Sequence, residues 1–377
     1  MKPGLPLDVK DKGVFSIHDR SVSIQLPADI APGQTSIYVN KDRRIMVLYA
    51  SGVAIKVYPV ALGGAPLGPK KKMGDQKTPE GDYYICERRS TNLPRRYGAR
   101  SLRLSYPNAA DARSAFTSRL ISQKQLRSIE AAIRARKMPP QNTPLGSSLR
   151  IHGGGVSTDW TLGCIAMRDP DVIEIFRCTQ GNTPVAIAAA KTHGDRDGDG
   201  IPDQVDILMG AIKLTMNKAS YDPAYFPMKY PMGDVPAGKG VCTDVIIRAM
   251  RNAGYDLQEL IHEDIRAHAS RYKNIVKADR QIDHRRVKNM ITYFLHHFKL
   301  LDRGFSAATR HTYRPGDIVF MDTLPKAGPD HVGIVADTRG TDGNPLIINN
   351  WTTGCVTARM ALLSTVPVTH HFRITSP

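Results

Sequence analysis

The chain has 377 residues, a formal net charge of +17 at pH 7, and a composition that is 41% hydrophobic and 23% charged. This length exceeds what one hydrophobic core usually serves, so we expect two domains, and the composition excludes a low-complexity chain. The positive charge favours a polyanionic partner, but because there is no zinc-finger spacing, basic heptad region or aromatic RNA-binding motif, we expect no nucleic-acid partner.

The N-terminal half predicts mostly β-structure with few helices. Residues 36–62 are rich in Val, Ile and Tyr and are interrupted by turns, which predicts two or three strands. Apolar residues at helical spacing predict a helix over 121–137. Asp169 as a cap and Gly181 as a stop predict a second helix, over 169–181. Further strands are expected within 74–87, 149–155 and 183–189.

The C-terminal half predicts helices first and strands afterwards. An Asp-rich stretch at 195–206 and a loop rich in Pro, Gly and aromatic residues at 221–240 precede a helical stretch over roughly 241–300. Helices followed by an antiparallel sheet form an α+β order, so we expect the domain boundary near 190–220. The expected strands are 316–322, 331–337 and 345–351.

Cysteine usage and hydropathy bound the compartment. Five cysteines are an odd number, which excludes a disulfide framework, although a Cys86–Cys178 bridge stays open and so does the disulfide state of Cys355. No apolar run reaches transmembrane length, so we expect no transmembrane segment. The first residues, MKPGLPLDVK, lack the apolar core of a signal peptide. This leaves three alternatives: a cytoplasmic location, a signal that has been removed, or another export route.

A histidine and a cysteine form the first candidate site. His152 ends a predicted strand in IHGGG, where a backbone carbonyl can fix the tautomer of the imidazole. Cys164 follows a glycine in DWTLGCIAM and precedes a predicted helix N-terminus, which favours an anion. A thiol, a base and oxyanion donors are the parts that cysteine catalysis needs. From the residues alone, the alternative is a structural pair with a small buried thiol.

The surrounding motifs resemble the L,D-transpeptidase catalytic domain of the YkuD family. The resemblance covers roughly residues 35–190 and includes GDQKTPEGDYY, LRLSYPNAADARSAF, the HG of IHGGG and the TLGC segment. It implies a β-rich, sandwich-like fold and attack on an L-centre–D-centre peptide bond of the peptidoglycan stem. Cys164 would be the nucleophile and His152 the base, and the Gly153 carbonyl would orient the histidine. Leu162 and Ala166 stand where family members often carry polar residues, so the acceptor stays open: an amine gives cross-linking, and water gives carboxypeptidase or endopeptidase action.

A second cysteine and histidine form another candidate site. The stretch GKGVCTDVIIRAMRNAGYDL predicts a helix with Cys242 in its first turn, where the helix dipole and free N–H groups lower the pKa of a thiol. His331 begins a predicted strand, and Asn349 and Asn350 lie on the next. A cysteine, a histidine and a polar orienter in this order follow papain-like logic. From the residues alone, a structural reading carries equal weight.

The segments YPMGDVPAGKGVCTDVIIRAMR, YRPGDIVFMD and DHVGIVAD resemble an uncharacterised bacterial domain that is distantly similar to NlpC-type cysteine peptidases and amidases. The resemblance covers roughly 215–377. It implies that Cys242 is the nucleophile, His331 the base and Asn349 the orienter. Asp244 and His284 either line this site or hold the helices. The alternative is a degenerate peptidase fold used for wall binding.

An aspartate loop lies between the two expected domains. The segment DRDGDGIPDQVD matches the ligand spacing of calcium loops, with Gly200 at the turn position. An Asp at position 12, in place of the usual Glu, leaves affinity and the choice between Ca²⁺ and Mg²⁺ open. The loop resembles those of thrombospondin-type and dockerin repeats, which implies a structural Ca²⁺ site; the alternative is a solvated acidic linker. The expected ligands are Asp195, Asp197, Asp199, the Ile201 carbonyl, Asp203 and Asp206.

Together these features predict a two-domain, peptidoglycan-modifying enzyme that needs no cofactor for catalysis and lies in the periplasm, outside the cell or at the cell wall. The rival interpretations are a secreted cell-wall hydrolase or toxin, and a non-catalytic wall-binding protein. Oligomeric state and the bond cut by the second domain stay open. The expected parts are an N-terminal extension (1–34), a mostly-β L,D-transpeptidase-like domain (35–190), an Asp-rich linker (191–214) and an α+β papain-like domain (215–377).

Overall fold

The computed structural model describes residues 22–190, 192–273, 275, 277–324 and 328–374. The chain divides into two compact units. The first unit is Ile30–Thr192, and the second joins His193–Pro377 to the N-terminal residues up to Asp29. Among the described residues, no helix combines the length and the apolar character that a membrane span requires.

One mixed sheet dominates the described part of the first unit. Its strands are β1 (Thr35–Asn40), β2 (Ile45–Ala50), β3 (Val53–Pro59), β4 (Gly81–Arg89), β5 (Ser101–Leu104), β6 (Arg150–His152), β7 (Ile165–Ala166) and β8 (Pro184–Ala188). Their order is β3-β2-β1-β8-β4-β5-β6-β7. Two neighbouring pairs, β1 with β8 and β6 with β7, are parallel. The range 36–62 therefore holds three strands. Strand β8, the last strand of this unit in chain order, lies in the middle of the sheet.

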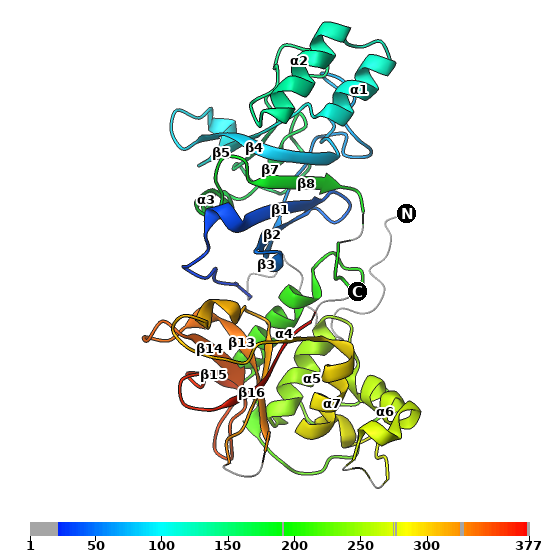
Figure 1. Ribbon diagram of the computed structural model, residues 1–377, viewed down its shortest axis with the longest axis vertical. Coiled ribbons are helices and arrows are strands. Elements are labelled where there is room, and N and C mark those ends of the chain that lie inside the picture. Colours follow the sequence, from blue (N-terminus) through cyan, green and yellow to red (C-terminus); the bar gives the residue numbers. More distant parts are fainter. Residues whose placement is uncertain (1–21, 191, 274, 276, 325–327, 375–377) are drawn as a thin grey trace. The chain divides into compact units, whose positions relative to one another are not determined.

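The first unit also has helices α1 (Ala109–Thr117), α2 (Gln123–Arg134) and α3 (Asp169–Cys178), with 3-10 turns η1 (Pro32–Gln34) and η2 (Arg95–Tyr97). Helix α3 packs against β5 and β6, and α1 and α2 pack against each other beyond β4 and β5 (Figure 1). Ser122 caps α2 and closes a capping box with Gln125, and this satisfies N–H groups that the first turn leaves unpaired. Helix α3 begins at Asp169, so Arg168 is its N-cap, and it ends three residues before Gly181. Its end differs from the predicted one because Thr179 already has extended backbone angles.

The second unit packs helices against an antiparallel sheet (Figure 1). In its described part the sheet has the order β11-β16-β12-β13-β14-β15, and β9 pairs with β10 separately. The strands are β9 (Ser220–Tyr221), β10 (Lys239–Gly240), β11 (Lys299–Leu301), β12 (Ile318–Met321), β13 (His331–Arg339), β14 (Pro345–Asn349), β15 (Ala358–Met360) and β16 (Val368–Arg373). The helices are α4 (Asp203–Asn217), α5 (Cys242–Asn252), α6 (Leu257–Ala267) and α7 (Val287–His297), with 3-10 turns η3 (Ala269–Arg271), η4 (Asp283–Arg285) and η5 (Arg310–Thr312).

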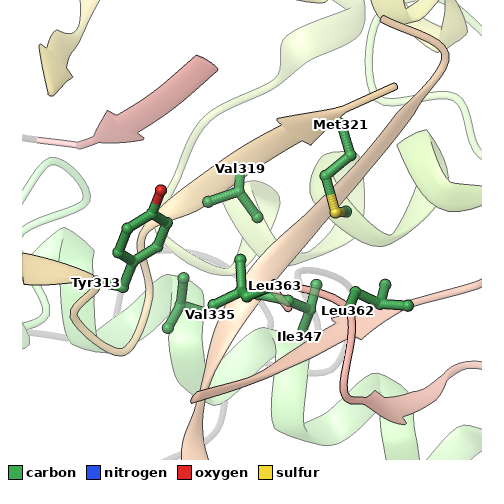
Figure 2. Close-up of a cluster of buried hydrophobic side chains, with 7 residues drawn as sticks. All are labelled: Tyr313, Val319, Met321, Val335, Ile347, Leu362 and Leu363. Carbon is green, nitrogen blue, oxygen red and sulfur yellow. The ribbon is translucent and has the colours of Figure 1, made fainter. Parts of the chain in front are cut away.

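Strand β12 is buried on both faces of the sheet. Phe320 points towards the helices, and its ring centroid lies 5.6 Å from that of Phe294 in α7. The next side chains along the strand, Val319 and Met321, point to the other face, because side chains alternate along a strand. There they pack in a cluster that loop residues cover, including Leu362 and Leu363 (Figure 2). All four residues of β12 are apolar and buried, which fits a strand covered on both faces.

Two segments differ from the expected division of the chain. Helix α4 begins at Asp203, inside the range interpreted as a linker, and its side chains are buried through most of its length against α5, β13 and β14. The described part of the N-terminal segment binds the second unit. There the Gln25 N–H donates to Asp337 at 2.9 Å, and Asp29 pairs with Arg339 at 2.9 Å.

Candidate functional site

Two short strands carry the first candidate pair. β6 and β7 run parallel, with His152 opposite Ala166. Cys164 directly precedes β7, so the same register places it opposite Arg150. Facing residues of neighbouring strands point to the same side of a sheet, and residues two apart on one strand share a side. Cys164 and His152 therefore project from one face, on adjacent strands and two positions apart.

His152 is held in one orientation. The imidazole is buried, and its Nδ1 lies 2.6 Å from the carbonyl oxygen of Gly153. Because a carbonyl only accepts, Nδ1 carries the proton and Nε2 is left as the basic nitrogen. Burial lowers the pKa of His152 to about 4; the hydrogen bond to Gly153 opposes this shift, and the charges of Arg150 and Arg96 add to it. The imidazole is therefore neutral at pH 7.

The Cys164 thiol is buried and protonated. Burial raises the pKa of this thiol. The N–H of Arg150, which donates to the sulfur, and nearby positive charges that include Lys70 lower the pKa and oppose this rise. The Sγ atom also lies 3.8 Å from the carbonyl oxygen of Ser148, a weak S–H···O contact. Because the thiol is protonated and the imidazole is neutral, the imidazole must take the thiol proton before the sulfur can attack.

The turn before Cys164 is shaped by its own polar residues. The hydroxyl of Thr161 donates to the Cys164 carbonyl at 2.7 Å and accepts from the Gly163 N–H at 3.1 Å. Gly163 has φ +126°, and a Cβ there would lie 2.6 Å from the Lys77 carbonyl oxygen. Only glycine fits this position, because an L side chain is both strained and in collision there. TLGC thus fixes the direction of the nucleophile locally.

Three further residues, none of them predicted to position the histidine, complete the surroundings of His152. The Tyr97 ring centroid lies 4.7 Å from that of His152, and the Trp160 ring approaches edge-on at 5.6 Å. Asp169, interpreted as a helix cap, accepts N–H groups from Ala99 and Gly154 through one oxygen. Trp160 is partly exposed, with 38% of its surface accessible, so it packs on the histidine and still reaches solvent.

The second candidate pair meets where α5 and β13 begin. Cys242 is the first residue of α5, and the N–H of Val332, the residue after His331, donates to the cysteine sulfur. The Nε2 of His331 lies 3.2 Å from the Oδ1 of Asn349. Since an amide oxygen only accepts, Nε2 carries the proton and Nδ1 is the basic nitrogen. The Trp351 ring lies 4.7 Å from the imidazole.

Both groups of this pair are neutral at rest. Burial raises the pKa of Cys242 to about 12, although N–H groups of Val332 and Thr243 donate to the sulfur and oppose the rise. Burial also lowers the pKa of His331, and the hydrogen bond from its ring to Asn349 opposes that shift. The sequence predicts that the helix dipole and free N–H groups lower the pKa of this thiol. The pKa is raised instead, because removing the thiolate from water costs more than these donors return.

Neighbouring polar residues hold the first turn of α5 and the segment before it in place. Asp244 accepts the Val241 N–H at 2.7 Å and binds the Arg285 guanidinium through both oxygens, at 2.8 and 2.9 Å. Of the two alternatives for Asp244, this geometry fits holding the helices. Asn350 donates to the carbonyls of Ala219 and Gly240 at 3.1 Å each, which fixes the segment before Cys242. Its buried Oδ1 has no hydrogen-bond partner among the described residues.

The aspartate loop gathers its carboxylates in two groups. Oxygens of Asp195, Asp197 and Asp199 all lie within 4.8 Å of one another. Asp203 and Asp206 lie in the first turn of α4, where Asp203 accepts from the Tyr255 hydroxyl at 2.6 Å and Asp206 from the Asn252 amide at 2.8 Å. Burial, then the neighbouring carboxylates, raise the pKa of Asp206 well above its usual value.

Comparisons with known proteins match a different domain to each half of the chain. The L,D-transpeptidase catalytic domain (YkuD) matches residues 34–187, and a domain of unknown function (DUF1287) matches residues 208–374. The chain is thus a cysteine-based, L,D-transpeptidase-like enzyme with a DUF1287 domain at its C-terminus. The uncharacterized protein YijF of Escherichia coli (strain K12) is 37% identical over 186 residues, which are 48% of this chain and 76% of YijF. The chain belongs to the family of YijF.

Solved structures are similar at low identity. Bd1075 from Bdellovibrio bacteriovorus is 24% identical, with a TM-score of 0.29. The match covers 44% of this chain and 51% of Bd1075. The helical cell shape determining protein Pgp2 from Campylobacter jejuni covers 91% of this chain, and 96% of its own length, at 14% identity with a TM-score of 0.30. An L,D-transpeptidase from Xylanimonas cellulosilytica covers 43% of this chain, and 63% of its own, at 10% identity with a TM-score of 0.25.

Proposed function

We propose that the first unit transfers or hydrolyses acyl groups of peptidoglycan stem peptides through a Cys164 acyl-enzyme. The observation that carries this is the shared face of β6 and β7, from which a neutral His152, with Nδ1 bound to Gly153, and a protonated Cys164 project. In the first step, Nε2 of His152 takes the thiol proton and the sulfur attacks the carbonyl of the L–D peptide bond. The imidazolium then protonates the leaving amine as that bond breaks, which leaves a thioester.

The second step determines the reaction type. His152 takes a proton from an amine or from water, the nucleophile attacks the thioester, and Cys164 leaves as a thiol after it regains the proton. Leu162, beside the nucleophile, is 71% exposed, so an apolar side chain faces the solvent where the acceptor would approach. Ala166 is fully buried and its N–H donates to Ala61, so it is part of the sheet. An amine acceptor gives cross-links, and water gives carboxypeptidase or endopeptidase products.

Purified muropeptides test this proposal. We expect the wild-type chain to release the D-residue or exchange it for an added amine, and Cys164→Ala to abolish both, as detected by mass spectrometry. Cys86→Ala is the matched control, because this half-buried thiol lies outside the pair. Cross-linked or exchanged products would exclude a pure hydrolase. Equal activity of Cys164→Ala and the wild type would contradict the catalytic assignment.

We propose further that the DUF1287 domain is a papain-like, NlpC-like cysteine peptidase or amidase. Cys242 at a helix N-terminus, beside His331 whose ring is oriented by Asn349, supports this. His331 would take the thiol proton through Nδ1, and the first N–H groups of α5 would stabilise the oxyanion. Cys242→Ala should abolish hydrolysis that Cys164→Ala leaves intact, with Cys355→Ala as the control. Wild-type hydrolysis in Cys242→Ala, with binding of the wall retained, would favour a wall-binding domain instead.

We propose that the aspartate loop binds a structural Ca²⁺. The supporting observation is the convergence of the Asp195, Asp197 and Asp199 oxygens. With the Ile201 carbonyl, Asp203 and Asp206, they supply the oxygen ligands that Ca²⁺ prefers. Calcium titration by calorimetry should give a binding heat that Asp199→Ala loses and that Asp222→Ala keeps, because Asp222 lies outside the loop and pairs with Lys239. No heat with the wild type would exclude the site. A wall substrate and extracellular Ca²⁺ would place the protein in the periplasm, outside the cell or at the cell wall, which fractionation of cells tests.

A further inference from the structure

A cavity of about 260 Å³ lies in the second unit, between the turn after α6 and the first turns of α7. Three cationic side chains, Arg271, Lys273 and Lys288, line it, and none of the described lining residues is a carboxylate. Asn289 adds a polar group, and Pro329 adds apolar surface. A concave site with convergent cations and an apolar wall fits an anionic organic ligand rather than a cation or a purely apolar one.

Two of the three positive charges are not compensated. Arg271 lies 3.4 Å from Asp264, which also accepts the Tyr272 hydroxyl, so its charge is balanced on the protein side. Lys273 and Lys288 are exposed and form no ion pair with any described residue. The cavity therefore presents two ammonium groups that a ligand carboxylate could reach.

Two sides of the cavity connect to the second candidate pair. Pro329 is two residues from His331 along the chain, and two residues span at most about 7 Å. The opposite wall is tied to Cys242 as well: Arg285, which precedes α7 by two residues, binds Asp244 in the first turn of α5. A peptide whose scissile bond lies at the cysteine would thus have a neighbouring residue within reach of the cavity.

We propose that this cavity binds a free carboxylate of the peptide that the Cys242–His331 pair cleaves. The substrate class is then an acidic stem peptide with an uncapped carboxylate near the scissile bond, held by Lys273 and Lys288. This inference rests on the proposed hydrolase function of the second unit. The two lysines position the substrate and take no part in bond breaking, so they act on binding and not on the chemical step.

Paired substrates test the inference: one stem peptide with free carboxylates, and the same peptide with these groups amidated. The double variant Lys273→Ala/Lys288→Ala should raise KM for the acidic peptide about fivefold, as expected for loss of exposed charge pairs, and leave kcat unchanged. The amidated peptide should give equal KM values with both proteins. Lys299→Ala is the matched control, because this exposed lysine lies past the other end of α7. Equal KM values of the variant and the wild type for the acidic peptide would overturn the inference.

A binding measurement separates this inference from the hydrolase proposal. If the wild type cleaves neither peptide, the hydrolase proposal fails, and calorimetry with Cys242→Ala then decides on the cavity alone. Tighter binding of the acidic than of the amidated peptide, lost when Lys273→Ala/Lys288→Ala is added, would support the cavity as a carboxylate site. Equal binding of the two peptides would overturn it.

Discussion

The Oδ1 atom of Asp169 lies 3.1 Å from the backbone nitrogen of Gly154 and accepts its hydrogen bond. The same oxygen accepts the N–H of Ala99 at 3.0 Å. One carboxylate thus joins the turn after His152 to the segment that carries Tyr97, whose ring packs on the imidazole. Asp169 does not enter the reaction, but it positions the base.

We therefore expect Asp169→Ala to lower kcat of the first site about tenfold, because small displacements of a catalytic base are costly. It should also move the acid limb of the pH profile towards the ordinary value of about 6.5, because a loosened turn admits water to His152. Asp169→Asn keeps an amide oxygen that accepts both N–H groups, so it should retain most activity. Wild-type kinetics and an unshifted profile for Asp169→Ala would contradict a positioning role.

The pH dependence of the first site follows from the buried imidazole. Burial lowers the pKa of His152 to about 4, and only the neutral ring can accept the thiol proton. We expect kcat/KM to be level from neutral pH downwards and to fall only near pH 4. The free energy of unfolding should fall over the same pH range. The pKa of His152 is about 6.5 in the unfolded chain and about 4 in the folded one, so between these values the unfolded chain binds more protons. Lowering the pH there favours the unfolded chain. Circular dichroism at each pH separates the two effects; an acid limb near 6.5 in folded protein would show that the imidazole is solvated.

The turn before the nucleophile gives a stability prediction. Gly163→Ala places a Cβ 2.6 Å from the Lys77 carbonyl oxygen at φ +126°, so we expect a loss of about 1–3 kcal/mol in the free energy of unfolding and of most first-site activity. Gly181→Ala is the control: no atom lies within 4 Å of its Cβ, and its φ is not positive. Urea unfolding and the muropeptide assay measure both. Equal stability of the two variants would show that the turn can relax.

Much of the first site could be predicted because its signals are local. His152 and Cys164 lie in short segments whose glycines and threonine shape the turns that hold them, so the residues carry the geometry. The contributions of Tyr97 and Asp169 could not be predicted in this way. Each depends on hydrogen bonds or ring contacts between segments far apart in sequence, and no spacing rule reports such contacts.

Helix α4 shows the opposite difficulty. Its first turn carries Asp203 and Asp206, which match the spacing of calcium-loop ligands, so the sequence favours a linker where the helix runs. The apolar residues after them surround the helix instead of forming one stripe, because α4 is buried by α5 on one side and by β13 and β14 on others. Helix α1 is not among the helices predicted from the sequence, although the capping box of Asn108 and Asp111 is a signal that could have found it.

The buried ion pair between Asp244 and Arg285 provides the strongest stability prediction. Both side chains are 3% exposed, and two hydrogen bonds join them, at 2.8 and 2.9 Å. Arg285→Ala leaves the Asp244 carboxylate buried without its partner, so we expect a loss of about 3–5 kcal/mol in the free energy of unfolding, with loss of second-site activity as α5 shifts. Arg266→Ala breaks a pair whose side chains are 66% and 53% exposed, and it should cost about 0–1 kcal/mol. Urea unfolding measures both losses. Similar values for the two variants would mean that water reaches Asp244, and that the first turn of α5, with Cys242, is held mainly by Asn350 and the backbone.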